Sequence, residues 1–316
     1  MKKYLKQFST IIILVVMVIF FTMCSGNFFK VNNILNILRQ VSVLSILTAG
    51  MTFVVISGGM DLTVGSYLGL TGVVAVQLMT VLHMNIGVSC LLTIIVITVF
   101  GLITGLLIVT LNVSPIVITL GMQTVVRGIA YIISGGLPIY DVPDSIVFLG
   151  QGYVFGIPVP VIIMVVIVLI MGIVLKYTYF GRYVYAIGGN VEAAKLAGVA
   201  VNKILISLYA ISAFLTALAG IALTGRLSSG APASGTGTEM DVITAVVIGG
   251  VSINGGKGSM LGAFVGAVII GVLSNGLTIM NVSEYYQQVV KGLVLILAVA
   301  FDVLANRERI KKVKAA

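Results

Sequence analysis

Residues 184–204 read VYAIGGNVEAAKLAGVAVNKI, a polar and alanine-rich stretch in a chain that is otherwise almost continuously apolar. Asn190 is a favourable helix N-cap, and Glu192 falls in the first turn, where a negative charge suits the helix dipole. Gly198 is a natural helix terminator. The sequence therefore predicts a short, independently capped helix over 190–198 that lies outside the membrane.

The apolar face of this predicted helix consists of Ala193, Ala194 and Ala197, which are too small to bury much area against lipid. Small side chains let another surface approach closely. Two interpretations follow: the helix is a docking element for a cytoplasmic protein, or it is an interfacial helix that only joins two membrane spans. We favour docking.

Composition identifies an integral membrane protein. Of 316 residues, 59% are hydrophobic and 9% are charged, and the mean hydropathy is +1.21, whereas about a quarter of the residues in soluble domains are charged. The net charge of +9 does not indicate nucleic acid, because the basic residues are spread over loops and chain ends. Cys24 and Cys90 lie in or beside apolar runs and are expected to be packing residues.

We predict an all-α polytopic fold that forms one transmembrane domain over residues 1–316. The first apolar run resembles a secretory signal but is long enough to span the bilayer, and no small-residue cleavage site follows it. Ten apolar segments reach spanning length, the eighth being short: about 8–26, 38–58, 62–82, 86–110, 115–134, 158–176, 204–226, 241–254, 259–280 and 287–305.

The distribution of basic residues predicts the orientation. With both termini in the cytoplasm, the loop 177–203 and the tail 306–316 are also cytoplasmic. Of the 18 Lys and Arg residues, 13 then lie inside: Lys2, Lys3, Lys6, Lys176, Arg182, Lys195, Lys203, Lys257, Arg307, Arg309, Lys311, Lys312 and Lys314.

Acidic residues show the opposite bias. This topology places five of them at or near the outer face: Asp141, Asp144, Glu239, Asp241 and Glu284. Such a rim either docks a basic soluble partner through complementary charge or simply solvates loops and caps helices.

Glu192-Ala193-Ala194, followed after three residues by Gly198, resembles the EAA loop by which permease subunits of ATP-binding cassette (ABC) importers engage their ATPase. Neighbouring motifs extend the resemblance from about residue 27 to residue 305. Together they are similar to the ribose-type monosaccharide permeases: SGGMDLTVGS at 57–66, GRYVYAIGGNVEAAKLAGV at 181–199, RLSSGAPASGTGTEMDVITAVVIGGVSINGGKGS at 226–259 and YYQQVVKGLVLILAVAFD at 285–302.

This resemblance implies a type II importer-like permease with short or broken helices and a cytoplasmic coupling helix, located in the bacterial inner membrane. The implied partners are a second permease subunit, cytoplasmic ABC ATPase subunits, an extracytoplasmic sugar-binding protein, a monosaccharide substrate and membrane lipid. The residues implied in ATPase coupling are Gly188, Gly189, Asn190, Glu192, Ala193, Ala194 and Gly198.

The chain is not expected to be an enzyme or to bind a cofactor. VSINGGKGS at 251–259 has Val251 in place of the first P-loop glycine and Gly258 in place of the hydroxyl that binds Mg²⁺. ATP and Mg²⁺ would therefore be used by the partner ATPase. No set of residues indicates a catalytic or metal site.

Glycine pairs mark the places where spans end or bend. VVISGGMDLTVGSYLG at 54–69 and VVIGGVSINGGKGSMLG at 246–262 share VVI, a glycine pair and GS-x-LG. The likeness is either an internal repeat or a recurrence of the same turn chemistry. Broken helices inside a membrane require protein or a water-filled cavity around the exposed backbone.

Polar residues in or beside the spans are candidates for the substrate pathway. Asp61 either contacts substrate or caps the following helix, and Arg127 is expected to have a partner within the bundle, with snorkelling as the alternative. Amides and hydroxyls suit a sugar, although each can equally join two helices. The full set is Asp61, Gln123, Thr124, Arg127, Thr244, Asn254 and Asn275.

Two function classes remain from the sequence. The first is a permease subunit that moves a sugar by alternating access and is powered by separate ATPase subunits. The second is an ion- or proton-coupled secondary carrier of a small polar solute, which would need acidic residues in mid-span. Because every acid is expected near the end of a span, the first class is favoured.

Overall fold

The computed structural model describes the backbone of residues 2–314 and the side chains of residues 10–300 and 303. In chain order the helices are α1 (Lys2–Cys24), α2 (Val31–Ile56), α3 (Val64–Val76) with its π-helical continuation η1 (Gln77–Val81), α4 (Ile86–Leu111), α5 (Pro115–Ser134), α6 (Asp144–Gln151), α7 (Val159–Tyr177), α8 (Tyr179–Gly189), α9 (Val191–Leu196), α10 (Val201–Leu227), α11 (Thr238–Ile248), α12 (Met260–Ile279) and α13 (Glu284–Lys314).

Seven helices among the described residues are long and apolar enough to cross a membrane: α2, α3 with η1, α4, α5, α7, α10 and α12. They coincide with seven of the ten predicted segments, although α2 begins at Val31, earlier than expected. The predicted segments 8–26 and 287–305 lie within α1 and α13. The side chains at the start of segment 8–26 and at the end of segment 287–305 lie outside the described residues. The side chains of the predicted tail 306–316 do so as well.

The predicted span 241–254 is not confirmed as a spanning helix. The structure has α11 there, with 11 residues, and at 1.5 Å per residue this helix covers about 16 Å, roughly half of a bilayer core. The glycine pair Gly249-Gly250 ends it, since Gly250 has a φ of +82° that glycine adopts without strain.

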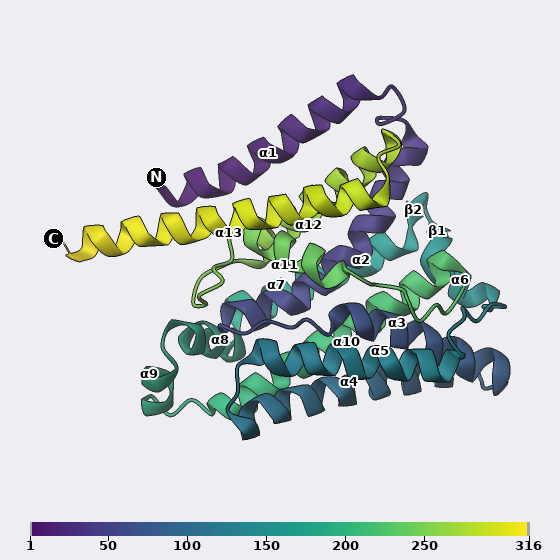
Figure 1. The fold of residues 1–316 in the computed structure, drawn as a ribbon, viewed down its shortest axis with the longest axis horizontal. Helices are drawn as coiled ribbons and strands as arrows, with labels where there is room; N and C mark the ends of the chain where they lie inside the picture. Colours follow the sequence, from purple (N-terminus) through teal and green to yellow (C-terminus); the bar gives the residue numbers. More distant parts are fainter. Residues whose placement is uncertain (1, 315–316) are drawn as a thin grey trace.

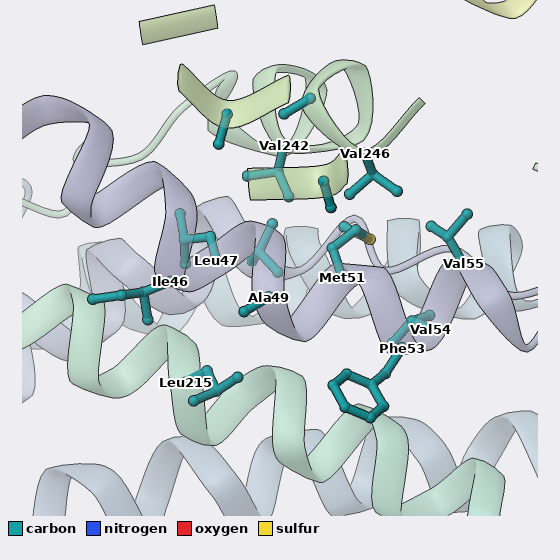
Figure 2. Packing of buried hydrophobic residues seen from close by; sticks show 14 of the residues in the cluster. Ile46, Leu47, Ala49, Met51, Phe53, Val54, Val55, Leu215, Val242 and Val246 are labelled. Carbon is teal, nitrogen blue, oxygen red and sulfur yellow. The ribbon is translucent and has the colours of Figure 1, made fainter. Parts of the chain in front are cut away.

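α2 forms the centre of the bundle. Its residues from Val41 to Ile56 are all buried, and it packs against α7, α10, α11 and α12. Figure 2 shows Met51 of α2 on the side of Val242 and Val246 of α11, whereas Phe53 of α2 lies on the side of α10, which carries Leu215. The short helix α11 is thus a core element of the bundle.

The bundle has two distinct ends. Figure 1 shows the start of α1 and the end of α13 at the end that carries α8 and α9, whereas α6 lies at the opposite end. Beside α6 is a departure from the predicted all-α fold, a hairpin of β1 (Tyr153–Val154) and β2 (Ile157–Pro158) in which Tyr153 pairs with Pro158. Phe155 and Gly156 form its turn, both with positive φ.

Candidate functional site

Asn190 begins α9, as the sequence predicts. Its side-chain Oδ1 accepts a hydrogen bond from the Ala193 backbone N–H at 3.0 Å. Glu192 lies in the first turn and forms an ion pair with Lys195 at 3.0 Å. Both side chains of that pair are exposed, so the pair contributes little to stability.

Gly198 ends α9, also as predicted. Its φ is +81°, its N–H donates to the Lys195 carbonyl at 2.9 Å, and the Val199 N–H donates to the Ala194 carbonyl at 3.0 Å. This pair of bonds is a Schellman motif, which satisfies carbonyls that the helix end would otherwise leave free.

The sequence did not reveal α8, which precedes α9 in the same loop. Thr178 caps α8 by accepting a hydrogen bond from the Gly181 N–H at 3.2 Å. α8 buries one face through Gly181, Val184 and Ile187. The loop 177–203 is therefore two capped helices anchored on the bundle.

Ala194 does not lie on the exposed face of α9, contrary to our expectation. It is buried against Ile187 and Val201. The exposed face instead carries Glu192, Ala193, Leu196 and Ala197, and the Leu196 side chain is 90% exposed. We call these four residues the docking face.

Behind the docking face, three chain segments meet at a glycine junction formed by Ile56, Gly188, Gly255 and Gly256. The Gly256 N–H donates to the Ile56 carbonyl at 2.8 Å. A Cβ on Gly188 would overlap that carbonyl and lie 2.5 Å from the Gly256 nitrogen, whereas Gly189 has open space around it. Gly188 therefore permits backbone contact between α8, the end of α2 and the loop that follows α11.

Tyr185 adds a second bond between α8 and that loop. Its hydroxyl donates to the Gly258 carbonyl at 3.0 Å. Burial raises the pKa of the Tyr185 phenol above its ordinary value, so the hydroxyl keeps its proton and remains a donor.

The two similar sequence stretches encode the same helix end. After α2, the Gly58 N–H donates to Val55 and the Gly59 N–H to Val54, and φ of Gly58 is +88°. After α11, the Gly250 N–H donates to the Val247 carbonyl and the Val251 N–H donates to the Val246 carbonyl in the same way. The VVI and glycine-pair part of the likeness is thus a repeated Schellman motif.

Asp61 lies in the loop after α2 and is fully buried. Its Oδ1 accepts hydrogen bonds from the backbone N–H and the hydroxyl of Thr63, and its Oδ2 accepts one from the Ser212 hydroxyl at 2.7 Å. Asp61 therefore ties the turn before α3 to α10. The N-cap residue of α3 is Thr63, so the N-cap interpretation of Asp61 is not confirmed.

Residues 228–237 connect α10 to α11 as an irregular segment that we call the strap. It runs along α3 on a face of three glycines. A Cβ on Gly69 would lie 2.6 Å from the Pro232 carbonyl oxygen, and one on Gly72 would lie 3.4 Å from the Gly230 Cα. The bare helix face lets the backbone of the strap approach closely.

Arg127 of α5 bonds to the same side of the strap, which confirms that it has a partner within the bundle. Its Nη1 donates to the carbonyls of Pro232 and Ser234, the latter at 2.8 Å. One turn earlier on α5, the Gln123 side-chain nitrogen donates to Glu239 Oε1 at 3.1 Å. Arg127 and Gln123 are the two pathway candidates that the fold brings together.

The remaining pathway candidates are scattered. Thr124 is exposed and bonds to its own helix, and Thr244 is buried and does the same. Asn275 exchanges two hydrogen bonds with Asn33 of α2, at 2.9 and 3.0 Å, and so joins two helices. Asn254 is exposed in the loop after α11.

Glu239 and Asp241, which were predicted at or near the outer face, do not form an exposed rim. Glu239 is buried beside Gln123 and Gly65. Asp241 forms an ion pair with Lys291 of α13 at 2.7 Å, and both side chains are mostly buried. Their partners lie far away in the sequence, and the topology inferred from charge alone could not place them.

We expect the Asp241–Lys291 pair to hold α13 against α11. Lys291→Met should lower thermal stability, because breaking a buried pair leaves one uncompensated charge at a cost of about 3–5 kcal/mol. The exchange Asp241→Lys with Lys291→Asp should recover most of the loss. Melting curves of the purified variants are the measurement, and an exchange variant no better than Lys291→Met would contradict the pairing.

Sequence reasoning missed Leu196 and Glu239. Leu196 falls one turn after Glu192 in the quoted stretch, so the helical period could have placed it on the exposed face. Glu239 is in the first turn of α11, which favours a carboxylate, but no sequence signal identifies Gln123 as its partner.

No group of three or more His, Cys, Asp or Glu residues that could hold a metal occurs among the described residues. A pocket between α4, α6, α7 and α10 contains none of the pathway candidates. Its lining is almost wholly apolar: Cys90, Ile94, Leu149, Ile163, Leu218, Ile221 and Ala222. Apart from the weak donor Cys90, this lining offers a sugar little to bond with.

These features describe a multi-pass helical membrane protein, a bundle with a short capped helix at one end. Residues 33–299 match the family described as the permease component of the branched-chain amino acid transport system, and the chain belongs to this family. No solved structure matches the chain.

Three curated relatives are similar over most of their length. The ribose import permease protein RbsC of Haemophilus influenzae is 42% identical to this chain, over 95% of this chain and 94% of the length of RbsC. RbsC of Bacillus subtilis is 40% identical over 92% of this chain and 90% of its own. The L-arabinose ABC transporter permease protein AraH of Azospirillum brasilense is 35% identical over 94% and 88%, respectively.

Proposed function

We propose that this protein is the membrane-spanning permease subunit of an ABC importer and that it translocates ribose or a similar monosaccharide. The similarity to ribose import permeases over about 95% of the chain carries this proposal. Ribose and L-arabinose, which appear in the names of its relatives, are both neutral pentoses. Neutral polyols are recognised by hydrogen-bonding groups more than by charge.

The proposed assembly follows from the docking face. An ATPase subunit would bind Glu192, Ala193, Leu196 and Ala197 on the cytoplasmic side, with Ala194, Gly198 and Asn190 shaping α9 behind them. When the ATPase moves, the glycine junction at Gly188 would transmit that movement from α8 and α9 to the end of α2. A second permease subunit and an extracytoplasmic sugar-binding protein would complete the importer. ATP and Mg²⁺ would be bound by the ATPase.

We further propose ten membrane crossings in the bacterial inner membrane. The strap together with α11 would make the eighth crossing, and α1 and α13 would make the first and last. The start of α1, the end of α13 and α9 lie at one end of the bundle, which fits an even number of crossings and a cytoplasmic position for all three.

The carrier alternative is not favoured. Asp61 and Glu239 are buried in the bundle, so the positions of the acidic residues do not argue against a carrier. Family membership and the similarity to import permeases now argue against it.

Reconstitution tests the function. We expect uptake of labelled ribose, or of another sugar in a panel of pentoses and hexoses, only when the cognate binding protein, the ATPase and ATP are all present. Uptake driven by an ion gradient without the ATPase would overturn the proposal in favour of a secondary carrier.

Cysteine labelling tests the orientation. In a variant in which Cys24 and Cys90 are replaced by alanine, we expect a cysteine introduced by Ala197→Cys to react with an impermeant reagent only after the cells are opened. Phe155→Cys is the matched control, because Phe155 is fully exposed in the hairpin at the opposite end. Labelling of the Ala197→Cys variant in intact cells would show that α9 faces the outside, opposite to the proposed topology.

A further inference from the structure

One side of the strap and of the first turn of α11 is exposed. Ala233, Thr236 and Gly237 are exposed, and Met240 is 46% exposed. The opposite side is the one that packs on the glycine face of α3 and bonds to Arg127. The strap therefore has a fixed inner side and an uncovered outer side.

The strap lies at membrane depth. Arg127, which bonds to the strap, is twelve residues into the 20-residue span α5, so at 1.5 Å per residue it is about 18 Å from the start of that helix. The Ser234 carbonyl is 2.8 Å from the Arg127 guanidinium and shares this depth.

Irregular backbone at this depth cannot face lipid, because hydrocarbon offers no partner for exposed N–H and C=O groups. It is tolerated only where protein covers it or where it lines a water-filled cavity. Residues 233–238 read ASGTGT, so this part of the exposed side carries only small side chains. The Thr236 hydroxyl donates to the Ala233 carbonyl at 2.7 Å and can still accept a hydrogen bond, and Met240 beyond it is a larger exposed side chain. Such a surface can exchange hydrogen bonds with water or with a neutral polyol.

A buried acceptor lies beside the strap. Glu239 is 7% exposed, and its Oε2 has no hydrogen-bond partner among the described residues. Glu239 Oε2 and the Gly235 carbonyl oxygen converge on the face of Gly65 that carries no side chain. Unpaired buried acceptors are costly, and a hydroxyl donor at this place would satisfy Glu239.

We propose that the exposed side of residues 233–240 lines the water-filled path by which a neutral polyhydroxyl solute crosses the membrane, with Glu239 as a hydrogen-bond acceptor for that solute. This inference rests on the proposed sugar-permease function. It assigns the path to a segment with which Thr244 shares one hydrogen bond, from its hydroxyl to the Met240 carbonyl, whereas Asp61 and Asn275 bond elsewhere.

Cysteine accessibility in the complete importer tests the path. In the Cys24→Ala, Cys90→Ala variant, we introduce Ala233→Cys and Thr236→Cys, both small changes at exposed positions that should fold. The matched control is Leu169→Cys, an exposed position within the apolar span α7. A small water-soluble thiol reagent should modify the two strap cysteines at least about tenfold faster than the control, because apolar surroundings suppress the reactive thiolate.

Two further readouts locate the path. Modification of the strap cysteines should block uptake, and sugar-loaded binding protein with ATP should slow the modification. Reactivity no greater than that of the Leu169→Cys control would overturn the proposal. Fast modification that neither blocks uptake nor responds to the sugar would also overturn it. Failure of the cysteine-free parent to take up any sugar would contradict the proposed function instead, since the reactivity comparison needs no substrate.

Discussion

Leu196→Glu is expected to abolish ATPase association and sugar uptake while leaving the membrane fold intact. Leu196 is 90% exposed on the docking face, and its side chain contributes almost nothing to the core. At an interface with the ATPase it would be an apolar anchor, and loss of such an anchor costs about 2 kcal/mol or more, roughly a 30-fold loss of affinity. A charge buried there in its place would add a desolvation penalty.

Co-purification of the ATPase with each variant is the decisive measurement. Phe155→Glu is the control, because it places the same charge on an exposed residue at the other end of the bundle. Full ATPase retention and normal uptake in Leu196→Glu would refute the docking assignment of α9.

Ala194→Trp separates docking from folding. Ala194 is buried against Ile187 and Val201, so a bulky side chain should displace α9 and lower stability, with overpacking costing typically about 1–3 kcal/mol. Leu196→Glu should leave the melting temperature unchanged. Equal melting temperatures for the two variants would mean that Ala194 does not pack inward.

Arg127→Leu is expected to lower uptake by about tenfold or more and to reduce thermal stability. The substitution leaves the carbonyls of Pro232 and Ser234 without their donor, and each unsatisfied buried carbonyl costs about 1–3 kcal/mol. The strap would then lose its attachment to α5. Arg127→Lys keeps a charged donor and should retain more activity.

Gly69→Ala is expected to disturb the same attachment of the strap. The added Cβ would lie 2.6 Å from both the Arg127 Nη1 and the Pro232 oxygen, so the strap must shift. Because both changes act on one contact, their effects on stability should be less than additive in the double variant. Additive losses, or unchanged uptake and stability in Arg127→Leu, would show that Arg127 does not hold the strap in the working protein.

Local chemistry explains which parts of this fold were predictable. Seven spans were predictable from hydropathy and length, because a helix of about 20 apolar residues matches the thickness of the hydrocarbon core of a bilayer. The start of α9 at Asn190 and its end at Gly198 also followed, since the bonds that define them join residues three to five positions apart. Helix ends of this kind are determined by a few neighbouring residues.

Tertiary structure decided the rest, because packing depends on residues that are far apart in the chain. The sequence contains Arg127 and Pro232 but no signal that joins them across 105 positions. It contains EAA at 192–194, yet only contact with Ile187 and Val201 determines that Ala194 points inward and Leu196 outward. The short helix α11 resembled a span because its residues are apolar. They are apolar because α2 and α12 bury them, which is a consequence of the fold that hydropathy cannot distinguish from burial in lipid.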